Sequence, residues 1–171
     1  PARREIHTGR YNFLHRSWGP LEPFDDSMPQ LLHESGTHTH LVTDHYHYFE
    51  DGGCTYHTRY TTHEISRGQE GEPWKADLRP IDIPEMVHGR SGPRIRQDFV
   101  NRSYMQREEE MSQPVTFRMG EEFLHTNHGE DNWFLHLETF DPHEPFFSPE
   151  RFQDLYRDYL QERHWDWPPY R

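Results

Sequence analysis

The clearest hydrophobic pattern in the chain is an apolar run at 133–140, which stops abruptly at a proline-rich segment. Its weak alternation and its aromatic and aliphatic side chains predict a largely buried strand of an α/β sheet. Pro142 and Pro145 flank His143 and remove the following backbone from any strand ladder. The pattern therefore predicts an imidazole presented at the end of a strand, which is where open α/β sheets bind ligands.

Two interpretations of His143 follow from this placement. The imidazole could act in a site as an acid, a base or an anion contact. It could instead belong to a turn in which it only bonds a neighbouring group, and the spacing alone favours this second interpretation.

A second strand is predicted at 38–43, where the residues are rich in β-branched side chains. It follows a helix expected at 25–35 that ends at Gly36. Asp25, Asp26 or Ser27 is expected to cap this helix, so the two aspartates are predicted to be caps rather than a cation site.

The remaining pattern indicates a helix, strand and helix alternation typical of an α/β domain. Further helices are expected at 1–12, 94–110, 115–125 and 148–160, and short strands are expected near 56–65 within an irregular excursion over 50–93.

Composition changes this picture in one respect. Only 31% of the 171 residues are hydrophobic, and aromatic residues make up 15% of the chain. The resulting content of aliphatic residues is low for an α/β domain, whereas the content of aromatic residues argues against disorder. We therefore expect the chain to be part of something larger.

Charge and cysteine content exclude several classes of function. The formal net charge of −12 disfavours binding to nucleic acids and anionic membranes, because phosphate groups would be repelled. No apolar run reaches the length of a membrane span. A single cysteine, Cys54, excludes an internal disulfide framework and a cysteine-rich zinc site.

Three motifs carry a resemblance to a known family. The start Pro1-Ala2-Arg3, followed by Thr8-Gly9, is similar to the Cys-x-Pro-x-Arg…Thr-Gly signature of type I sulfatases without its first two residues. Pro142-His143-Glu144-Pro145 resembles the Pro-His-x-Pro element of that family. The segment Arg67-Gly68-Gln69-Glu70 also resembles a sulfatase feature.

The resemblance implies a fold and an activity. The fold would be a partial alkaline-phosphatase-like sandwich, with a mixed sheet and helices on both faces, and residues 1–171 would be part of the N-terminal catalytic domain. The activity would be that of a sulfuric ester hydrolase acting on a small-molecule or glycan sulfate ester. The resemblance places the formylglycine nucleophile just upstream of Pro1 and the Ca²⁺ ligands outside this chain, so the isolated chain is expected to be inactive.

The resemblance also assigns roles to individual residues. Arg3 would steady the nucleophile, His47 would hydrogen-bond it or assist collapse of the ester, and His143 would bind sulfate or protonate the leaving oxygen. Asp44 stands where the family has a sulfate-binding Lys, so His45 would supply the positive group.

Two alternatives remain open at this point. Relatives with the same nucleophile that lack the Lys hydrolyse phosphonates or phosphodiesters. The chain could also be a non-catalytic, histidine-rich metal-binding or interaction module, because the chain has 15 histidines and His45 and His47 would alternate to one face of a strand.

Overall fold

The computed structural model describes residues 2–15, 20–50, 55–85, 92–160 and 166–167, so that Pro1 and Cys54 lie outside the described residues. The chain divides into two compact units. Unit 1 consists of Pro1–Ile65 and Thr116–Glu138, and unit 2 consists of Ser66–Val115 and Thr139–Arg171.

Unit 1 is built on a parallel sheet of three described strands in the order β2-β1-β3. The strands are β1 (His38–Thr43), β2 (Thr62–Ile65) and β3 (Trp133–Glu138). The register pairs Thr43 with Ile65 on one side and with Glu138 on the other, so the carboxyl ends of all three strands lie in line. The predicted strands at 38–43 and within 133–140 are confirmed, as is the α/β class.

Burial differs between the two predicted strands. The central strand β1 is buried from Thr39 to Thr43, as expected for a strand with neighbours on both sides. β3 is half-buried along its whole length, so the expectation of a largely buried strand is wrong. The reason is that β3 forms an edge of the described sheet. The described strands are all parallel, so they do not include an antiparallel member of the mixed sheet that was expected.

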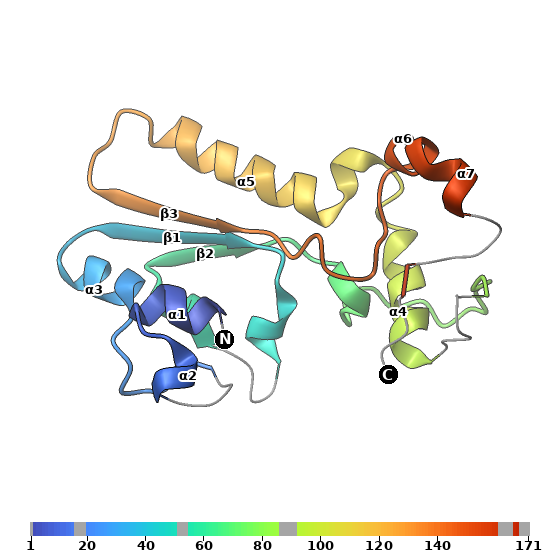
Figure 1. Ribbon diagram of the computed structural model, residues 1–171. Coiled ribbons are helices and arrows are strands. Elements are labelled where there is room, and N and C mark those ends of the chain that lie inside the picture. Colours follow the sequence, from blue (N-terminus) through green and yellow to red (C-terminus); the bar gives the residue numbers. More distant parts are fainter. Residues whose placement is uncertain (1, 16–19, 51–54, 86–91, 161–165, 168–171) are drawn as a thin grey trace. The chain divides into compact units, whose positions relative to one another are not determined.

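Helices lie on both faces of this sheet, as predicted (Figure 1). Three helices lie on one side: α1 (Ala2–Thr8), α2 (Asn12–His15) and α3 (Met28–Glu34). On the other side lies α5 (Ser112–Thr126), which belongs to unit 1 from Thr116 onward. Phe123 of α5 stacks on the ring of His40 in β1 with a centroid distance of 4.8 Å. Gly120 of α5 allows close approach, because a Cβ there would lie 2.5 Å from Leu137.

The core of unit 1 is mainly aromatic. Its buried members are Leu21, Leu41, Tyr48, Tyr56 and Tyr60, with Phe134 packed against them. Aromatic side chains bury a large area each, and buried tyrosines require partners for their hydroxyl groups. The core therefore compensates for the low aliphatic content, and it brings polar hydroxyls into the interior.

Of the three residues expected to cap α3, the structure confirms the position of Ser27 but not of the two aspartates. The N-cap residue is Ser27, and its side chain makes no capping hydrogen bond. Asp25 instead forms a buried ion pair with Arg4 of α1, with Oδ2 2.8 Å from Nη2. The buried guanidinium requires a counter-charge, and this requirement takes the carboxylate away from the helix terminus.

Unit 2 contains short helices and irregular segments. Its elements are η3 (Gln69–Gly71), α4 (Pro93–Arg102), η5 (Glu108–Glu110), α6 (Glu150–Gln153), η6 (Asp154–Tyr156) and α7 (Arg157–Leu160). The helix expected at 94–110 is thus shorter than predicted, and the helix expected at 148–160 is divided into three pieces. No helix in the described part of the chain combines the length and apolar character that a bilayer span requires.

The core of unit 2 forms around α4. Ile95 and Trp167 are buried together, with Ile83 and Phe99 packed against them. Trp167 donates from Nε1 to Oδ2 of Asp98 at 3.1 Å, and Arg102 pairs with the same carboxylate at 2.6 Å. A buried carboxylate with an indole donor and a paired guanidinium has the compensation that its burial requires.

The contact between η3 and α4 generates a prediction about Gly71. This residue has φ 72°, and a Cβ there would lie 2.4 Å from the carbonyl oxygen of Arg94. We expect Gly71→Ala to lower the free energy of unfolding by at least about 2 kcal/mol, because a left-handed backbone conformation and a clash with backbone are combined. Urea denaturation checks this value. The matched change Gly129→Ala has open space around it, and an equal loss in both variants would contradict the prediction.

Candidate functional site

A polar network lies at the carboxyl edge of the sheet in unit 1. Glu138, the last residue of β3, accepts a hydrogen bond from Nε of Arg3 at 2.5 Å through Oε1. The Tyr48 hydroxyl donates to the other carboxylate oxygen of Glu138. The guanidinium carbon of Arg3 also lies 5.2 Å from the centre of the Tyr48 ring. One carboxylate therefore fixes a cation and a phenol at the strand ends.

The local structure explains how these side chains meet. Arg3 comes from α1, and Tyr48 comes from the 3₁₀ helix η1 (Tyr46–Phe49), which follows β1 after a short link. Parallel pairing of β1 and β3 brings the ends of both strands to one edge. Burial raises the pKa of the Tyr48 hydroxyl, and the Glu138 carboxylate raises it further. Tyr48 thus stays protonated and remains a hydrogen-bond donor to Glu138.

Histidines and a tyrosine extend this network into the core. The Tyr60 hydroxyl hydrogen-bonds Nδ1 of His136 at 2.5 Å and Nε2 of His7 at 3.3 Å. A hydroxyl has one hydrogen, so it donates to one ring and accepts from the other. His7 also bonds the Ser27 hydroxyl through Nδ1 at 2.8 Å. Burial lowers the pKa of His7 to about 4 and lowers the pKa of His136, so both rings are neutral near pH 7.

The predicted residues after β1 lie in this unit as well. His47 is part of η1, and its Nδ1 lies 2.6 Å from Oε2 of Glu50. His45 is the N-cap of η1, and its ring centre lies 4.8 Å from that of His47. The two rings are thus close, but the expectation that they alternate on a strand is wrong because the strand ends at Thr43. Asp44 is fully buried at the position where a family Lys was expected.

His143 lies in unit 2, on the turn that follows β3. Its backbone N–H donates to the carbonyl of Phe140 at 3.2 Å, and its ring packs against the Phe140 ring at 4.4 Å. Nδ1 lies 2.9 Å from the carbonyl oxygen and 3.1 Å from Oε2 of Glu144. The local bond that the simpler interpretation expects is therefore present. The side chain is nevertheless about half exposed.

His143 also lines a pocket of about 400 Å³ that lies within unit 2. Much of the lining is apolar and aromatic, contributed by Met105, Met111, Phe146, Phe147 and Phe152. Its polar residues include Gln69 and Asp141, and burial raises the pKa of the Asp141 carboxyl against a lowering hydrogen bond with Gln69. No Lys or Arg is among the described residues that line it. An apolar pocket with a few polar groups is typical of small-molecule sites.

The sequence interpretation missed several members of these clusters. The sequence pattern does not single out Tyr48 or His136, whereas a charged residue near the end of the apolar run at 133–140 is a signal for Glu138. Glu70 was noted only as part of a motif. The structure gathers Arg3, His45 and His47 in unit 1 and places His143 in unit 2.

The fold and the site define an α/β protein with a polar, histidine-rich carboxyl edge and a second unit that carries a pocket of the kind that binds small molecules. A protein-family model described as Sulfatase matches residues 1–165. The chain therefore belongs to the sulfatase family, a group of hydrolases with an alkaline-phosphatase-like fold. No curated protein and no solved structure gives a match.

Calcium is expected from the family, and the His, Cys, Asp and Glu side chains of the described residues were compared with its ligand preferences. One group of three potential ligands is brought together there, formed by Glu70, His143 and Glu144. Calcium takes six to eight oxygen ligands, and an imidazole nitrogen does not suit it. We therefore assign no calcium ligand within the described chain.

The network at Glu138 generates a prediction about Tyr48. Replacing Tyr48 by Phe keeps the packed ring but removes the donor from one oxygen of a mostly buried carboxylate. We expect Tyr48→Phe to lower the free energy of unfolding by about 1–3 kcal/mol. Tyr104→Phe makes the same change at an exposed ring of unit 2, where about 0.5 kcal/mol or less is expected. Denaturant unfolding that gives equal values for both variants would contradict this assignment.

The buried histidine of α1 generates a prediction about pH. Since the pKa of His7 is about 4 in the folded protein and near 6.5 when unfolded, the unfolded state binds more protons in this interval. Stability contributed by neutral His7 is complete above about pH 6.5 and falls by about 3 kcal/mol as the pH drops to about 4.

Urea unfolding across this pH interval measures the loss, and His7→Gln provides the control because Gln does not titrate. The variant should lose less stability than the wild type on acidification. Parallel pH profiles, or an NMR titration of the His7 ring with its midpoint near 6.5, would disprove the assignment.

Proposed function

We propose that the chain is part of the catalytic domain of a sulfuric ester hydrolase that uses a formylglycine nucleophile. The observation that carries the proposal is the family match over residues 1–165, which includes the Arg3 motif and the Pro-His-Glu-Pro segment. Hydrated formylglycine would supply the oxygen that attacks sulfur, and in the sulfatase signature it stands two residues before the proline aligned with Pro1. The chain supplies positioning and acid–base groups.

Arg3 is assigned the role of steadying the nucleophile. Its Nε is held by Glu138 and its guanidinium lies near the Tyr48 ring, so the orientation of the cation is defined by the sheet edge. A fixed cation stabilises negative charge that develops in a transition state without reorganisation at the time of reaction. On a solvated helix end the Arg3 side chain would be mobile. The contacts with Glu138 and Tyr48 instead hold it in one orientation, which supports a catalytic role.

His47 is assigned as a hydrogen-bond partner of the nucleophile or as a base that assists collapse of the ester. Nδ1 of His47 faces the Glu50 carboxylate, which favours a proton on that nitrogen. Nε2 is then the nitrogen that accepts a proton from a hydroxyl. His45, 4.8 Å away between ring centres, is assigned the positive contact to sulfate that Asp44 does not supply.

His143 is assigned the sulfate contact or the protonation of the leaving oxygen. Glu144 holds Nδ1, so the ring orientation is defined and Nε2 is the atom that meets a substrate. The adjoining pocket has aromatic walls and no Lys or Arg among its described lining residues. It therefore suits the uncharged alcohol part of a small sulfate ester better than a polysulfated glycan.

Replacement of His143 tests this assignment in the full-length protein. We expect His143→Asn to lower kcat/KM for an aryl sulfate by about 10²–10³-fold, because a general acid or anion contact is lost. The matched change His128→Asn affects an exposed imidazole that bonds the His125 carbonyl, and it should leave turnover unchanged. Equal rates in His143→Asn and wild type would rule out the role, and the isolated 171 residues should show no turnover.

The competing reaction is hydrolysis of phosphonate esters or phosphodiesters. The buried acid Asp44 at the position of the family Lys is the observation that favours it. An aryl sulfate and an aryl phosphonate ester of the same phenol, compared in the same assay, discriminate the two reactions. A higher kcat/KM for the phosphonate ester would replace the sulfatase assignment.

A further inference from the structure

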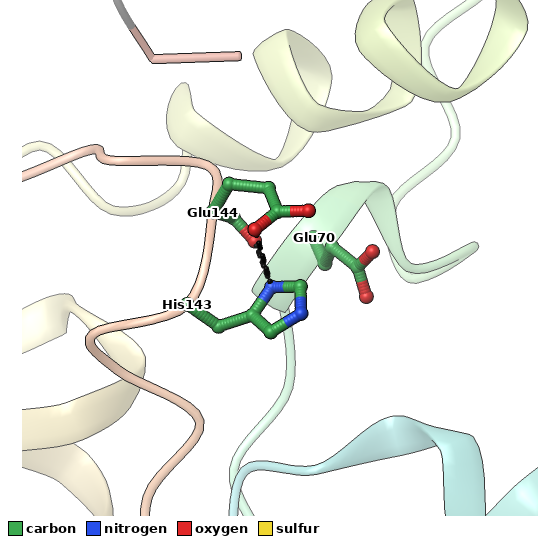
Figure 2. A group of neighbouring side chains, drawn as sticks. All are labelled: Glu70, His143 and Glu144. Atoms are coloured by element: carbon green, nitrogen blue, oxygen red, sulfur yellow. Dashed lines mark hydrogen bonds and ion pairs between the residues drawn. The ribbon is translucent and has the colours of Figure 1, made fainter. Parts of the chain in front are cut away.

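Three side chains of unit 2 gather ligand atoms of the kind that transition metals prefer. One atom from each of Glu70, His143 and Glu144 lies within 4.8 Å of the others (Figure 2). The exposed fractions of the three side chains are 8%, 48% and 13%, respectively. The two carboxylates are therefore shielded from water, while the imidazole remains accessible from solvent.

Glu70 is held in place by its backbone and by a neighbouring cation. It has φ 53° and ψ 30°, a left-handed conformation that non-glycine residues rarely adopt. Arg94 donates from Nε to its carbonyl at 3.0 Å and pairs through Nη2 with Oε1 at 2.5 Å. A carboxylate oriented in this way by a second residue is typical of metal-ligand surroundings.

Charge in this cluster is only partly balanced by the described residues. Arg94 neutralises the Glu70 carboxylate, whereas the described ion-pair partner of Glu144 is His143, which is charged only when protonated. Burial of a carboxylate is costly unless a cation compensates its charge. A bound divalent cation would provide that compensation.

We propose that Glu70, His143 and Glu144 form a binding site for a divalent ion of the zinc type. Imidazole nitrogen and carboxylate oxygen are donors that zinc accepts, and three protein ligands with a fourth position open to water match the ligand number of open zinc sites. Donor atoms around tetrahedral zinc are about 3.4 Å apart. Side-chain rotations that move the three ligand atoms by about 1 Å would bring them to this spacing.

Occupancy of this site has a functional consequence that rests on the proposed function. An imidazole nitrogen that ligates a metal is not available to contact the sulfate group or to protonate the leaving oxygen. Zinc would therefore inhibit the enzyme by competing with the sulfate ester at His143. The inhibition would raise KM and leave kcat nearly unchanged.

Calorimetric titration of the full-length protein with Zn²⁺ tests the site, with excess Ca²⁺ present to occupy oxygen-only sites. We expect one tight equivalent in the wild type and a loss of at least tenfold in affinity in both His143→Asn and Glu144→Gln. His128→Asn is the matched control for weak binding by exposed histidines, and it should keep the tight equivalent. Co²⁺ in place of Zn²⁺ should give a tetrahedral visible absorption that both site variants lose.

Unchanged zinc affinity in the folded His143→Asn variant would overturn the proposal, and so would displacement of Zn²⁺ by Ca²⁺. Circular dichroism checks that each variant is folded, and the half-exposed His143 decides the result if Glu144→Gln fails to fold. A separate measurement, turnover of sulfate esters, shows whether the proposed function fails. Absence of turnover with every sulfate ester would remove the kinetic consequence, whereas the binding titration would still decide the metal site.

Discussion

The parallel pairing of β1 with β2 and β3 is the constraint on which the organisation of unit 1 depends. β1 is buried along nearly its whole length, and its register sets Thr43, Ile65 and Glu138 side by side at one edge. Because all carboxyl ends meet there, a helix at the start of the chain and a segment after β1 can both reach Glu138. The position of Arg3 therefore follows from strand register rather than from its local helix.

The aromatic core and the polar network of unit 1 both follow from the low aliphatic content of the chain. With few aliphatic residues, the chain buries tyrosines, and their hydroxyls require partners that the interior must supply. Glu138 serves Tyr48, and His136 serves Tyr60. Histidine suits this purpose because burial keeps it neutral, so it satisfies a hydroxyl without adding a buried charge.

In unit 2 the two roles proposed for His143 involve opposite ligands, an anion and a metal cation. A neutral ring offers a nitrogen lone pair to a metal, whereas a protonated ring attracts an anion. The pocket beside His143 supplies apolar walls for the organic part of a substrate, and the carboxylates of Glu70 and Glu144 favour a cation.

The sequence by itself determined part of the local elements and the family. Periodicity and β-branched composition identified the strands at 38–43 and 133–138, the helices near the start of the chain and α5, and the motifs around Arg3 and His143 identified the sulfatase family. Tertiary structure alone decided the division into two units, the pairing of Asp25 with Arg4, and the contact of Arg3 with Glu138 across 135 positions. Local sequence patterns encode burial and backbone preference. The partner of a charged side chain depends instead on strand register and long-range packing, and neither can be recognised from residues that are close together in the sequence.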